Sequence, residues 1–332
     1  MNADRAEVLR KLRSEDRFVL VTHESPDGDA LGSLVGMQGL LESLGKDSVM
    51  YVSERDLPLP YEYAWLDLDG LVSTPPEDAD TRTLVFLDCG NLDRNPVEDL
   101  RASATCIVNV DHHHDNTRFA DINHVVPEAS STAEVVWDLM HDLGVQPTRR
   151  VAEGLYVGLV TDTGRFMYTN TGVRAHEMAA ELVAAGVNVH ETFRRLYEGM
   201  PEPKVALLAR ALDVMERYDD GRLTYVMLGL DDFARTGAQE SYTEGIIDHL
   251  RAIDGTKVAA LTRSIPPIDG GAARAKVSLR ATDGEVDVSA IARAGGGGGH
   301  RQAAGFTTEL EPDEIVAFLR SQIAAQLAQT AH

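Results

Sequence analysis

The chain alternates between short apolar runs and longer stretches in which apolar residues recur at helical spacing. Four apolar runs predict strands at residues 18–21, 49–52, 83–87 and 106–110. Helical spacing occurs in residues 4–13, 30–44, 134–143, 151–160, 174–185 and 191–198. Strands that alternate with helices in this way predict an α/β fold with a mostly parallel sheet and helices on both faces.

The second half of the chain predicts a separate, smaller domain. Residues 199–203, Gly-Met-Pro-Glu-Pro, interrupt the helical pattern. Further strands are predicted at 223–228, 257–265 and 275–279, and further helices at 243–251 and 312–327. A chain of 332 residues is longer than a single hydrophobic core ordinarily serves. We therefore predict two domains with the active site in the cleft between them. Their predicted bounds are 1–190 for the N-terminal domain, 191–205 for a linker and 206–330 for a C-terminal α/β domain.

The composition is that of an ordinary globular protein, with 43% hydrophobic and 25% charged residues. No apolar run is long enough to span a bilayer, and the charged N-terminus lacks a signal-peptide core, so no membrane partner is expected. Cys89 and Cys106 both lie in apolar, strand-like runs. Two buried thiols are expected rather than a disulfide, which favours a reducing, cytoplasmic location.

The net charge of −22 narrows the class of substrate. Long nucleic acid is gripped through many Lys and Arg contacts to phosphates, so an acidic chain is a poor candidate for binding a long strand or duplex. A small anionic substrate held by a few local cations remains compatible with this charge. The acidic excess is also compatible with adaptation to a salty habitat.

A polar cluster, Asn-Val-Asp-His-His-His-Asp-Asn, follows the fourth predicted strand at residues 109–116. Open α/β sheets bind their ligands at the carboxyl ends of strands. Asp111, His112 and His113 would be costly to desolvate at such a place unless a cation binds them. The alternative is an exposed, inert histidine-rich turn.

Other ends of predicted elements carry the same chemistry. His23, Asp27 and Asp29 follow the first strand, Asp88 follows the third, and Asp162 ends a helix. Taken singly, Asp29 could cap a helix, Asp88 could belong to a turn, and Asp162 could simply terminate its helix. Together, these carboxylates would repel one another unless divalent cations bind them. Mixed carboxylate and imidazole donors suit manganese, iron or zinc, and a pair of metals suits displacement at phosphorus.

These motifs resemble those of the DHH phosphoesterases. The resemblance rests on Val-Thr-His-x-x-Pro-Asp-Gly-Asp-Ala-Leu-Gly-Ser from residue 21, Asp88, Asp-His-His from 111, and Gly-x-x-Thr-Asp-Thr-Gly-x-Phe ending at 166. Gly-Gly-Gly-His-Arg-x-Ala-Ala-Gly-Phe, ending at residue 306, is similar to the signature of the DHH-associated C-terminal domain. Within the family the chain is most similar to the nanoRNases, which trim very short oligoribonucleotides and dephosphorylate pAp.

The resemblance implies a role for each motif residue. Two divalent cations, Mn²⁺ in this family, would be held by six ligands: His23 and Asp27 on one metal, Asp29, His112 and Asp162 on the other, and Asp88 bridging both. Asp111 would orient imidazoles, and His113 would face the scissile phosphate as a charge stabiliser or proton donor. A hydroxide shared by the two metals would be the nucleophile.

The glycine run that ends at residue 299 is a candidate anion-binding turn, because backbone N–H groups of glycines can approach phosphate closely. The alternative is a flexible linker. The predicted substrate-binding residues are Gly297, Gly298, Gly299, His300, Arg301, Arg263 and Arg280. Residues 257–306 hold seven Lys or Arg against four acids, a local net charge of +3. Arg263 and Arg280 could equally be ordinary exposed strand residues.

The sequence therefore predicts a manganese-dependent phosphoesterase that hydrolyses di- to pentanucleotides of RNA and dephosphorylates pAp. One alternative is a phosphodiesterase for cyclic or linear di-adenylate. A pyrophosphatase or exopolyphosphatase is another, although that branch is expected to carry a different C-terminal domain. The last alternative is a non-catalytic dinucleotide sensor. Such a sensor is expected to lack one of the metal ligands, whereas all six candidate ligands are present in this sequence. The resemblance is also compatible with a homodimer.

Overall fold

The structure, a computed structural model, describes residues 3–92, 97–266 and 274–330. The chain divides into two compact units, Met1–Gly199 and Met200–His332. The predicted linker at 191–205 is largely helical, because it contains most of α7 (Val189–Tyr197) and the start of α8 (Glu202–Asp213). The break in the helical pattern at 199–203 falls between these two helices and over the first residues of α8.

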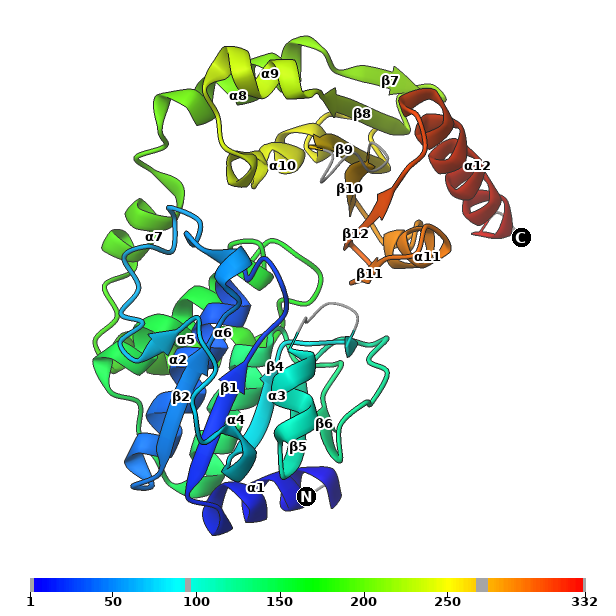
Figure 1. Cartoon of the computed structure of the whole chain (residues 1–332). Coiled ribbons are helices and arrows are strands. Elements are labelled where there is room, and N and C mark those ends of the chain that lie inside the picture. The colour runs from blue at the N-terminus through cyan, green and yellow to red at the C-terminus, as the bar shows by residue number, and fades with distance from the viewer. Residues whose placement is uncertain (1–2, 93–96, 267–273, 331–332) are drawn as a thin grey trace. The chain divides into compact units, whose positions relative to one another are not determined.

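The first unit is built on a six-stranded sheet in the order β3-β2-β1-β4-β5-β6, in which every neighbouring pair is parallel. Its strands are β1 (Arg17–Val21), β2 (Asp47–Tyr51), β3 (Leu71–Val72), β4 (Thr83–Leu87), β5 (Cys106–Asp111) and β6 (Ile122–Val125). The four predicted strands are present, and β3 and β6 were not predicted. The strand order places the ends of β1, β4 and β5 side by side at the middle of the sheet (Figure 1).

Helices cover both faces of this sheet, as predicted, but unequally. The helices of the unit are α1 (Ala3–Ser14), α2 (Gly28–Ser43), α3 (Glu98–Ser103), α4 (Thr132–Leu143), α5 (Arg149–Asp162), α6 (Val173–Ala184) and α7. The larger core joins one face of the sheet to all of these helices except α3. The smaller core lies on the opposite face, against α3 and neighbouring loops.

Glycines allow α2 and α5 to approach each other closely. A β-carbon at Gly32 would stand 2.3 Å from the carbonyl oxygen of Gly154. A side chain at either position would therefore force the two helices apart. This approach matters for function because α2 begins and α5 ends beside the predicted metal ligands.

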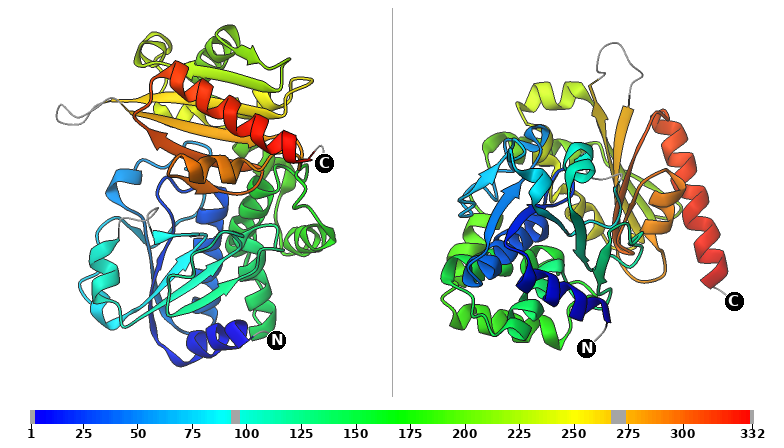
Figure 2. Two further views of the ribbon diagram at one scale, coloured as in Figure 1. Left: turned by 90° about the vertical axis from the view of Figure 1, so that its right-hand side faces the viewer. Right: turned by 60° about the horizontal axis from the view of Figure 1, so that its bottom comes forward.

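The second unit has a mixed six-stranded sheet in the order β11-β12-β10-β9-β8-β7. Its strands are β7 (Glu216–Tyr218), β8 (Leu223–Leu228), β9 (Val258–Ile265), β10 (Arg274–Ala281), β11 (Gly298–Gly299) and β12 (Ala303–Thr308). Its helices are α8, α9 (Leu230–Thr236), α10 (Ile246–Arg251), α11 (Val288–Ala294) and α12 (Pro312–Thr330). One core packs the sheet against α11 and α12, and another packs it against α8, α9 and α10 (Figure 2). Among the described residues, no helix has both the length and the apolar character that crossing a membrane requires.

Candidate metal centre

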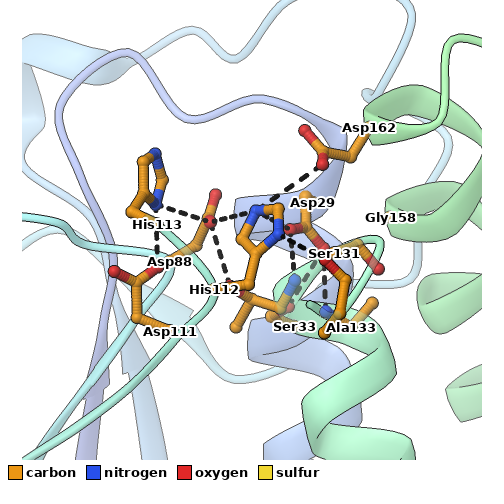
Figure 3. A network of polar contacts seen from close by, with 12 residues as sticks. Asp29, Ser33, Asp88, Asp111, His112, His113, Ser131, Ala133, Gly158 and Asp162 are labelled. Carbon is orange, nitrogen blue, oxygen red and sulfur yellow. Dashed lines mark hydrogen bonds and ion pairs between the residues drawn. The ribbon is translucent and has the colours of Figure 1, made fainter. Parts of the chain in front are cut away.

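The polar residues predicted from the strand ends converge at the carboxyl edge of the first sheet. His23 lies just beyond β1, Asp88 directly follows β4, and Asp111 is the last residue of β5. These three strands are neighbours, so their ends deliver side chains to one place. Figure 3 shows the carboxylate of Asp88 between the rings of His112 and His113.

Asp88 presents its two carboxylate oxygens to different histidines. Its Oδ2 lies 3.5 Å from Nε2 of His23, and its Oδ1 lies 3.7 Å from Nε2 of His112. The residue also has a left-handed backbone, with φ of 59°. Such a conformation is unfavourable for a non-glycine residue and is concentrated at functional sites. Asp88 is therefore placed to serve two neighbouring ligand groups at once.

Three sets of potential metal-ligating atoms include Asp88, and two of them consist of residues predicted as metal ligands. His23, Asp27 and Asp88 offer one set, and Asp29, Asp88 and His112 offer the other, each with its donor atoms within 4.8 Å of one another. Asp162 joins the second set, since its Oδ2 lies 3.5 Å from Nε2 of His112. The structure thus brings together all six residues predicted as metal ligands.

Backbone carbonyls orient the two imidazoles. Nδ1 of His23 lies 2.8 Å from the carbonyl oxygen of Glu24, and Nδ1 of His112 lies 3.1 Å from that of Ala129. Because a carbonyl can only accept a hydrogen bond, each Nδ1 carries the proton. Nε2 of each ring is then the atom turned toward the carboxylates, which is the usual arrangement of a metal-ligating histidine.

Asp29 is held by the N-terminus of α4, with a longer contact of 3.4 Å from the hydroxyl of Ser33 in its own helix. The backbone N–H groups of Thr132 and Ala133 donate to its two oxygens at 2.7 and 2.9 Å. The alternative in which Asp29 caps α2 is wrong, because the cap is Asp27, which accepts from the N–H groups of Asp29 and Ala30. Asp29 therefore reaches across to a second helix and is fixed there.

Thr132 and Asn170 were missed at the sequence level. The hydroxyl of Thr132 donates to Oδ1 of Asp88 at 3.0 Å, and the amide of Asn170 donates to Oδ2 of Asp162 at 3.4 Å. A signal for the first existed, because Ser131 and Glu134 have capping-box spacing and the hydroxyl of Ser131 accepts from the N–H of Glu134. That pattern starts α4 at Thr132, two residues earlier than predicted.

The charge of the cluster fits divalent cations. Burial disfavours the charged imidazole of His112, but the carboxylates of Asp162 and Asp29 outweigh it and raise its pKa to about 10. Burial, together with the negative charge of Asp88, raises the pKa of Asp162 to about 7. Protons are therefore retained where carboxylates crowd together. Cations bound by this mixed oxygen and nitrogen donor set would replace those protons.

Asp111 and His113 form a pair beside the ligand groups. Asp111 is completely buried, and its Oδ1 lies 2.8 Å from Nδ1 of His113. Burial opposes ionisation of Asp111, but the positive charge and hydrogen bond of His113 outweigh it and lower the pKa of that carboxyl. With Nδ1 engaged, His113 has Nε2 as its remaining nitrogen.

The glycine segment of the second unit is packed, so the flexible-linker alternative is wrong. Gly298 and Gly299 form β11 and pair with β12. A β-carbon at Gly297 would stand 2.1 Å from the carbonyl oxygen of Gly305, and the N–H of Gly297 donates to the carbonyl of Ala292 at the end of α11. Glycine is required at position 297 because the backbone of Gly305 lies so close to it. The N–H of Gly297 is already bonded to Ala292, so binding an anion is not the reason for a glycine at this position.

The hairpin turn between β11 and β12 carries His300 and Arg301. His300 pairs with Ala303 through two backbone hydrogen bonds of 2.7 and 3.1 Å. Arg301 is exposed, and its guanidinium donates to the carbonyl oxygen of Gly284 at 2.9 Å. The turn therefore presents a cationic side chain on a rigid, doubly bonded backbone.

Arg263 and Arg280 lie on one face of the second sheet together with Lys276, which was not predicted. The alternate residues of β10 are buried against α11 and α12, so Lys276 and Arg280 emerge on the opposite face. Lys276 is in register with Arg263 of β9. Arg263 lies on the same face of β9 as Leu261, two residues earlier, and Leu261 packs in the core formed with α8, α9 and α10. Period-two alternation in residues 275–281 is the signal that could have included Lys276.

Part of the local positive charge is already paired. Arg263 forms an ion pair with Glu240. Lys257 contacts Asp283 at 2.8 Å and Glu285 at 2.9 Å. The net charge of residues 257–306 therefore overstates the charge available to an anionic ligand.

Comparison with known proteins agrees with this architecture. Residues 17–159 match the DHH family, N-terminal domain, and residues 222–326 match the DHHA1 domain. The chain is 34% identical over 309 residues to the bifunctional oligoribonuclease and PAP phosphatase NrnA of Thermus thermophilus, covering 91% of this chain and 86% of that protein. The chain belongs to the DHH family. The predicted family is thereby confirmed, and with it the class of phosphoesterase.

Other DHH family relatives cover almost the whole chain. The bifunctional oligoribonuclease and PAP phosphatase NrnA of Bacillus subtilis is 26% identical, over 96% of this chain and 98% of its own length. An exopolyphosphatase-related protein from Bacteroides fragilis has the same fold, with a TM-score of 0.86, 24% identity and coverage of 99% and 98% of the two chains. The DHH family fold therefore extends over both units.

Proposed function

We propose that this DHH family phosphoesterase hydrolyses oligoribonucleotides of two to five nucleotides to nucleoside monophosphates and also dephosphorylates pAp. The observation that carries the proposal is the position of Asp88, whose two oxygens face two different histidines, His23 and His112. A shared carboxylate of this kind suits a pair of metals that act on a phosphate ester. The full-length similarity to oligoribonucleases and PAP phosphatases supports this choice of substrate.

The ligand roles follow the two donor sets. His23 and Asp27 would hold one divalent cation, Asp29, His112 and Asp162 the other, and Asp88 both. Mn²⁺ suits this mixture of carboxylate and imidazole donors. When bound, such cations lower the pKa of a coordinated water and neutralise charge on the phosphoryl oxygens.

The remaining predicted residues would act on the substrate itself. His113, held through Nδ1 by Asp111, would meet the scissile phosphate through Nε2. In the second unit, His300, Arg301, Arg263 and Arg280 would bind the non-reacting part of the nucleotide. Gly298 and Gly299 would allow the nucleotide to approach the backbone closely, and Gly297 would contribute by packing this segment against Gly305. Lys276 would add a further cation on the face of Arg263 and Arg280.

The surroundings of the site favour short substrates. The net charge of −22 and the pairing of Lys257 with Asp283 and Glu285 leave few cations for an extended strand. The DHHA1 match also favours a nucleotide substrate over pyrophosphate, following the expectation that pyrophosphatases carry a different C-terminal domain. Cys89 and Cys106 are free thiols, which supports a cytoplasmic location. A homodimer is expected from the family and can be tested by light scattering.

The test is a product analysis with defined metal. Protein stripped with EDTA is supplied with MnCl₂ and offered a 5′-phosphorylated RNA dinucleotide, pAp, linear and cyclic di-adenylate, pyrophosphate and a long single strand, each separately. Asp88→Asn, purified identically, controls for contaminating nucleases because it lacks the proposed shared ligand. We expect nucleoside monophosphate from the dinucleotide and phosphate from pAp, with the long strand nearly untouched.

Each other outcome overturns the proposal in a different way. Preference for di-adenylate would reassign the substrate within the same chemistry. Turnover of pyrophosphate alone would overturn the role given to the second unit. Binding of a dinucleotide without turnover, in protein shown to contain two metals, would make the chain a sensor.

A further inference from the structure

We infer that Asn116 is a positioning residue of the hydrolytic site: its amide fixes Asp111, and Asp111 in turn fixes the ring of His113. This inference rests on the proposed function and deepens it. The sequence motifs assign Asn116 no role, whereas the structure connects it directly to the buried carboxylate behind His113 (Figure 3 shows Asp111 and His113).

The two oxygens of Asp111 are held from opposite ends. Nδ1 of His113 lies 2.8 Å from Oδ1, and Nδ2 of Asn116 lies 2.5 Å from Oδ2. Because Asp111 is completely buried, no solvent is available to replace a lost donor. With both oxygens engaged, rotation of the carboxylate would break one bond or the other. The orientation of Asp111 therefore depends on Asn116.

The orientation of Asp111 decides between two partners for His113. Nδ1 of His113 lies 2.8 Å from Oδ1 of Asp111, and Oδ1 of Asp88 is 3.6 Å away. If Asp111 turned away, the imidazole could form its hydrogen bond with Asp88 instead. That exchange would tilt the ring and engage the carboxylate proposed to hold both metals. By fixing Asp111, Asn116 thus keeps His113 bonded to Asp111 and leaves Asp88 to the metals.

Asn116 is itself fixed at every polar atom. Its Nδ2 also donates to the carbonyl oxygen of Cys89 at 3.2 Å, and its Oδ1 accepts from the N–H of Arg118 at 2.6 Å. The donor from Arg118 settles which end of the amide is oxygen. Since Cys89 directly follows Asp88, the amide also ties the end of β4 to the end of β5. An amide of this length satisfies all three contacts at once.

The test uses two substitutions and one matched control. Asn116→Ala removes both donors, and Asn116→Asp keeps the shape but places a second carboxylate against Asp111. The control is Asn123→Ala, which removes an asparagine whose amide exchanges hydrogen bonds with the backbone of Ala120 in the neighbouring β6 segment. For each protein we would measure kcat and KM on the RNA dinucleotide with MnCl₂, and the affinity for Mn²⁺ by calorimetry. The hydrogen-bonded Nδ1 proton of His113 would be followed by proton NMR in the metal-free protein.

We expect both Asn116 variants to lose roughly 10- to 100-fold in kcat, the size typical of a residue that supports a reacting group. KM and the affinity for Mn²⁺ should stay near wild type, the low-field Nδ1 proton signal should be lost or shifted, and Asn123→Ala should match wild type throughout. Wild-type kcat in Asn116→Ala would overturn the inference, and so would a loss confined to Mn²⁺ affinity. Turnover of the dinucleotide by the wild-type enzyme is read in the same experiment, so failure of the proposed function is seen separately.

Discussion

Gly158 of α5 lies directly against Asp29 of α2. A β-carbon at position 158 would stand 2.8 Å from Oδ1 of Asp29 and 2.8 Å from the β-carbon of Ala133 in α4. Helices α2, α4 and α5 therefore meet at Gly158, where there is room for the hydrogen atom of a glycine but not for a larger side chain. The position of a proposed metal ligand is set by helix packing as well as by hydrogen bonds.

Gly158→Ala should displace Asp29 and weaken metal binding. The added methyl group overfills a packed junction, a change that typically costs about 1–3 kcal/mol of stability. Calorimetric titration with Mn²⁺ should show a lower affinity, and urea unfolding should show the loss of stability. Gly172→Ala is the matched control, because a β-carbon there meets nothing within 4 Å. Unchanged Mn²⁺ affinity in Gly158→Ala would contradict the role given to this junction.

Thr132→Val should lower the affinity for Mn²⁺ by roughly 10- to 100-fold, the usual effect of removing a partner of a ligand. The substitution keeps the shape of the side chain and removes the hydroxyl that donates to Asp88, while the N–H that donates to Asp29 remains. Thr132→Ser should restore binding. Thr224→Val, which removes a buried hydroxyl bonded to Thr256 in the second unit, is the control. Equal affinities in Thr132→Val and wild type would remove Thr132 from the site.

His124 should make the first unit sensitive to acid. Burial, with a smaller effect from the positive charge of Arg5, lowers the pKa of His124 to about 4. Since the unfolded value is about 6.5, the unfolded chain binds more protons between pH 6.5 and 4, and stability falls as the pH falls through that range. The whole shift corresponds to about 3 kcal/mol as an upper bound.

His124→Val should flatten this dependence. Urea unfolding at pH values above and within the window would give the free energy of unfolding for the variant and wild type, and their difference isolates His124 from the other histidines. His190→Ala removes an exposed histidine and should leave the wild-type slope. A parallel pH dependence in His124→Val and wild type would show that His124 titrates normally.

Arg301→Ala should raise KM for the dinucleotide with little change in kcat. The proposed contact of this exposed guanidinium is to a non-reacting part of the substrate, so ground state and transition state lose it equally. Initial rates over a range of dinucleotide concentration would separate the two constants. A fall in kcat at unchanged KM would instead assign Arg301 to the chemical step.

Much of the site could be predicted because parallel strands deliver their ends to one edge. The apolar runs before His23, Asp88 and Asp111 placed these residues at strand ends, and the structure brings them together. Strand β6 was missed because Asn123 and His124 interrupt its apolar character. Strand β12 was missed because Ala-Ala-Gly lacks the β-branched and aromatic residues that mark strands.

What the sequence could not provide was partners distant along the chain. Asp29 lies next to a helix start in sequence, but the shortest of its hydrogen bonds comes from the N–H of Thr132, 103 residues away. Likewise, the charge count around Arg263 could not reveal its ion pair with Glu240. Local patterns identify the chemical groups, whereas tertiary packing decides which of them meet.

The wide spacing of the ligand groups has a consequence during protein synthesis. The donors that meet at Asp88 range from His23, at the end of the first strand, to Asp162, at the end of α5. A nascent chain that has not yet emerged beyond residue 162 lacks one of these donors and the helix that packs against Asp29. Assembly of the proposed metal centre thus waits until nearly the whole first unit has left the ribosome.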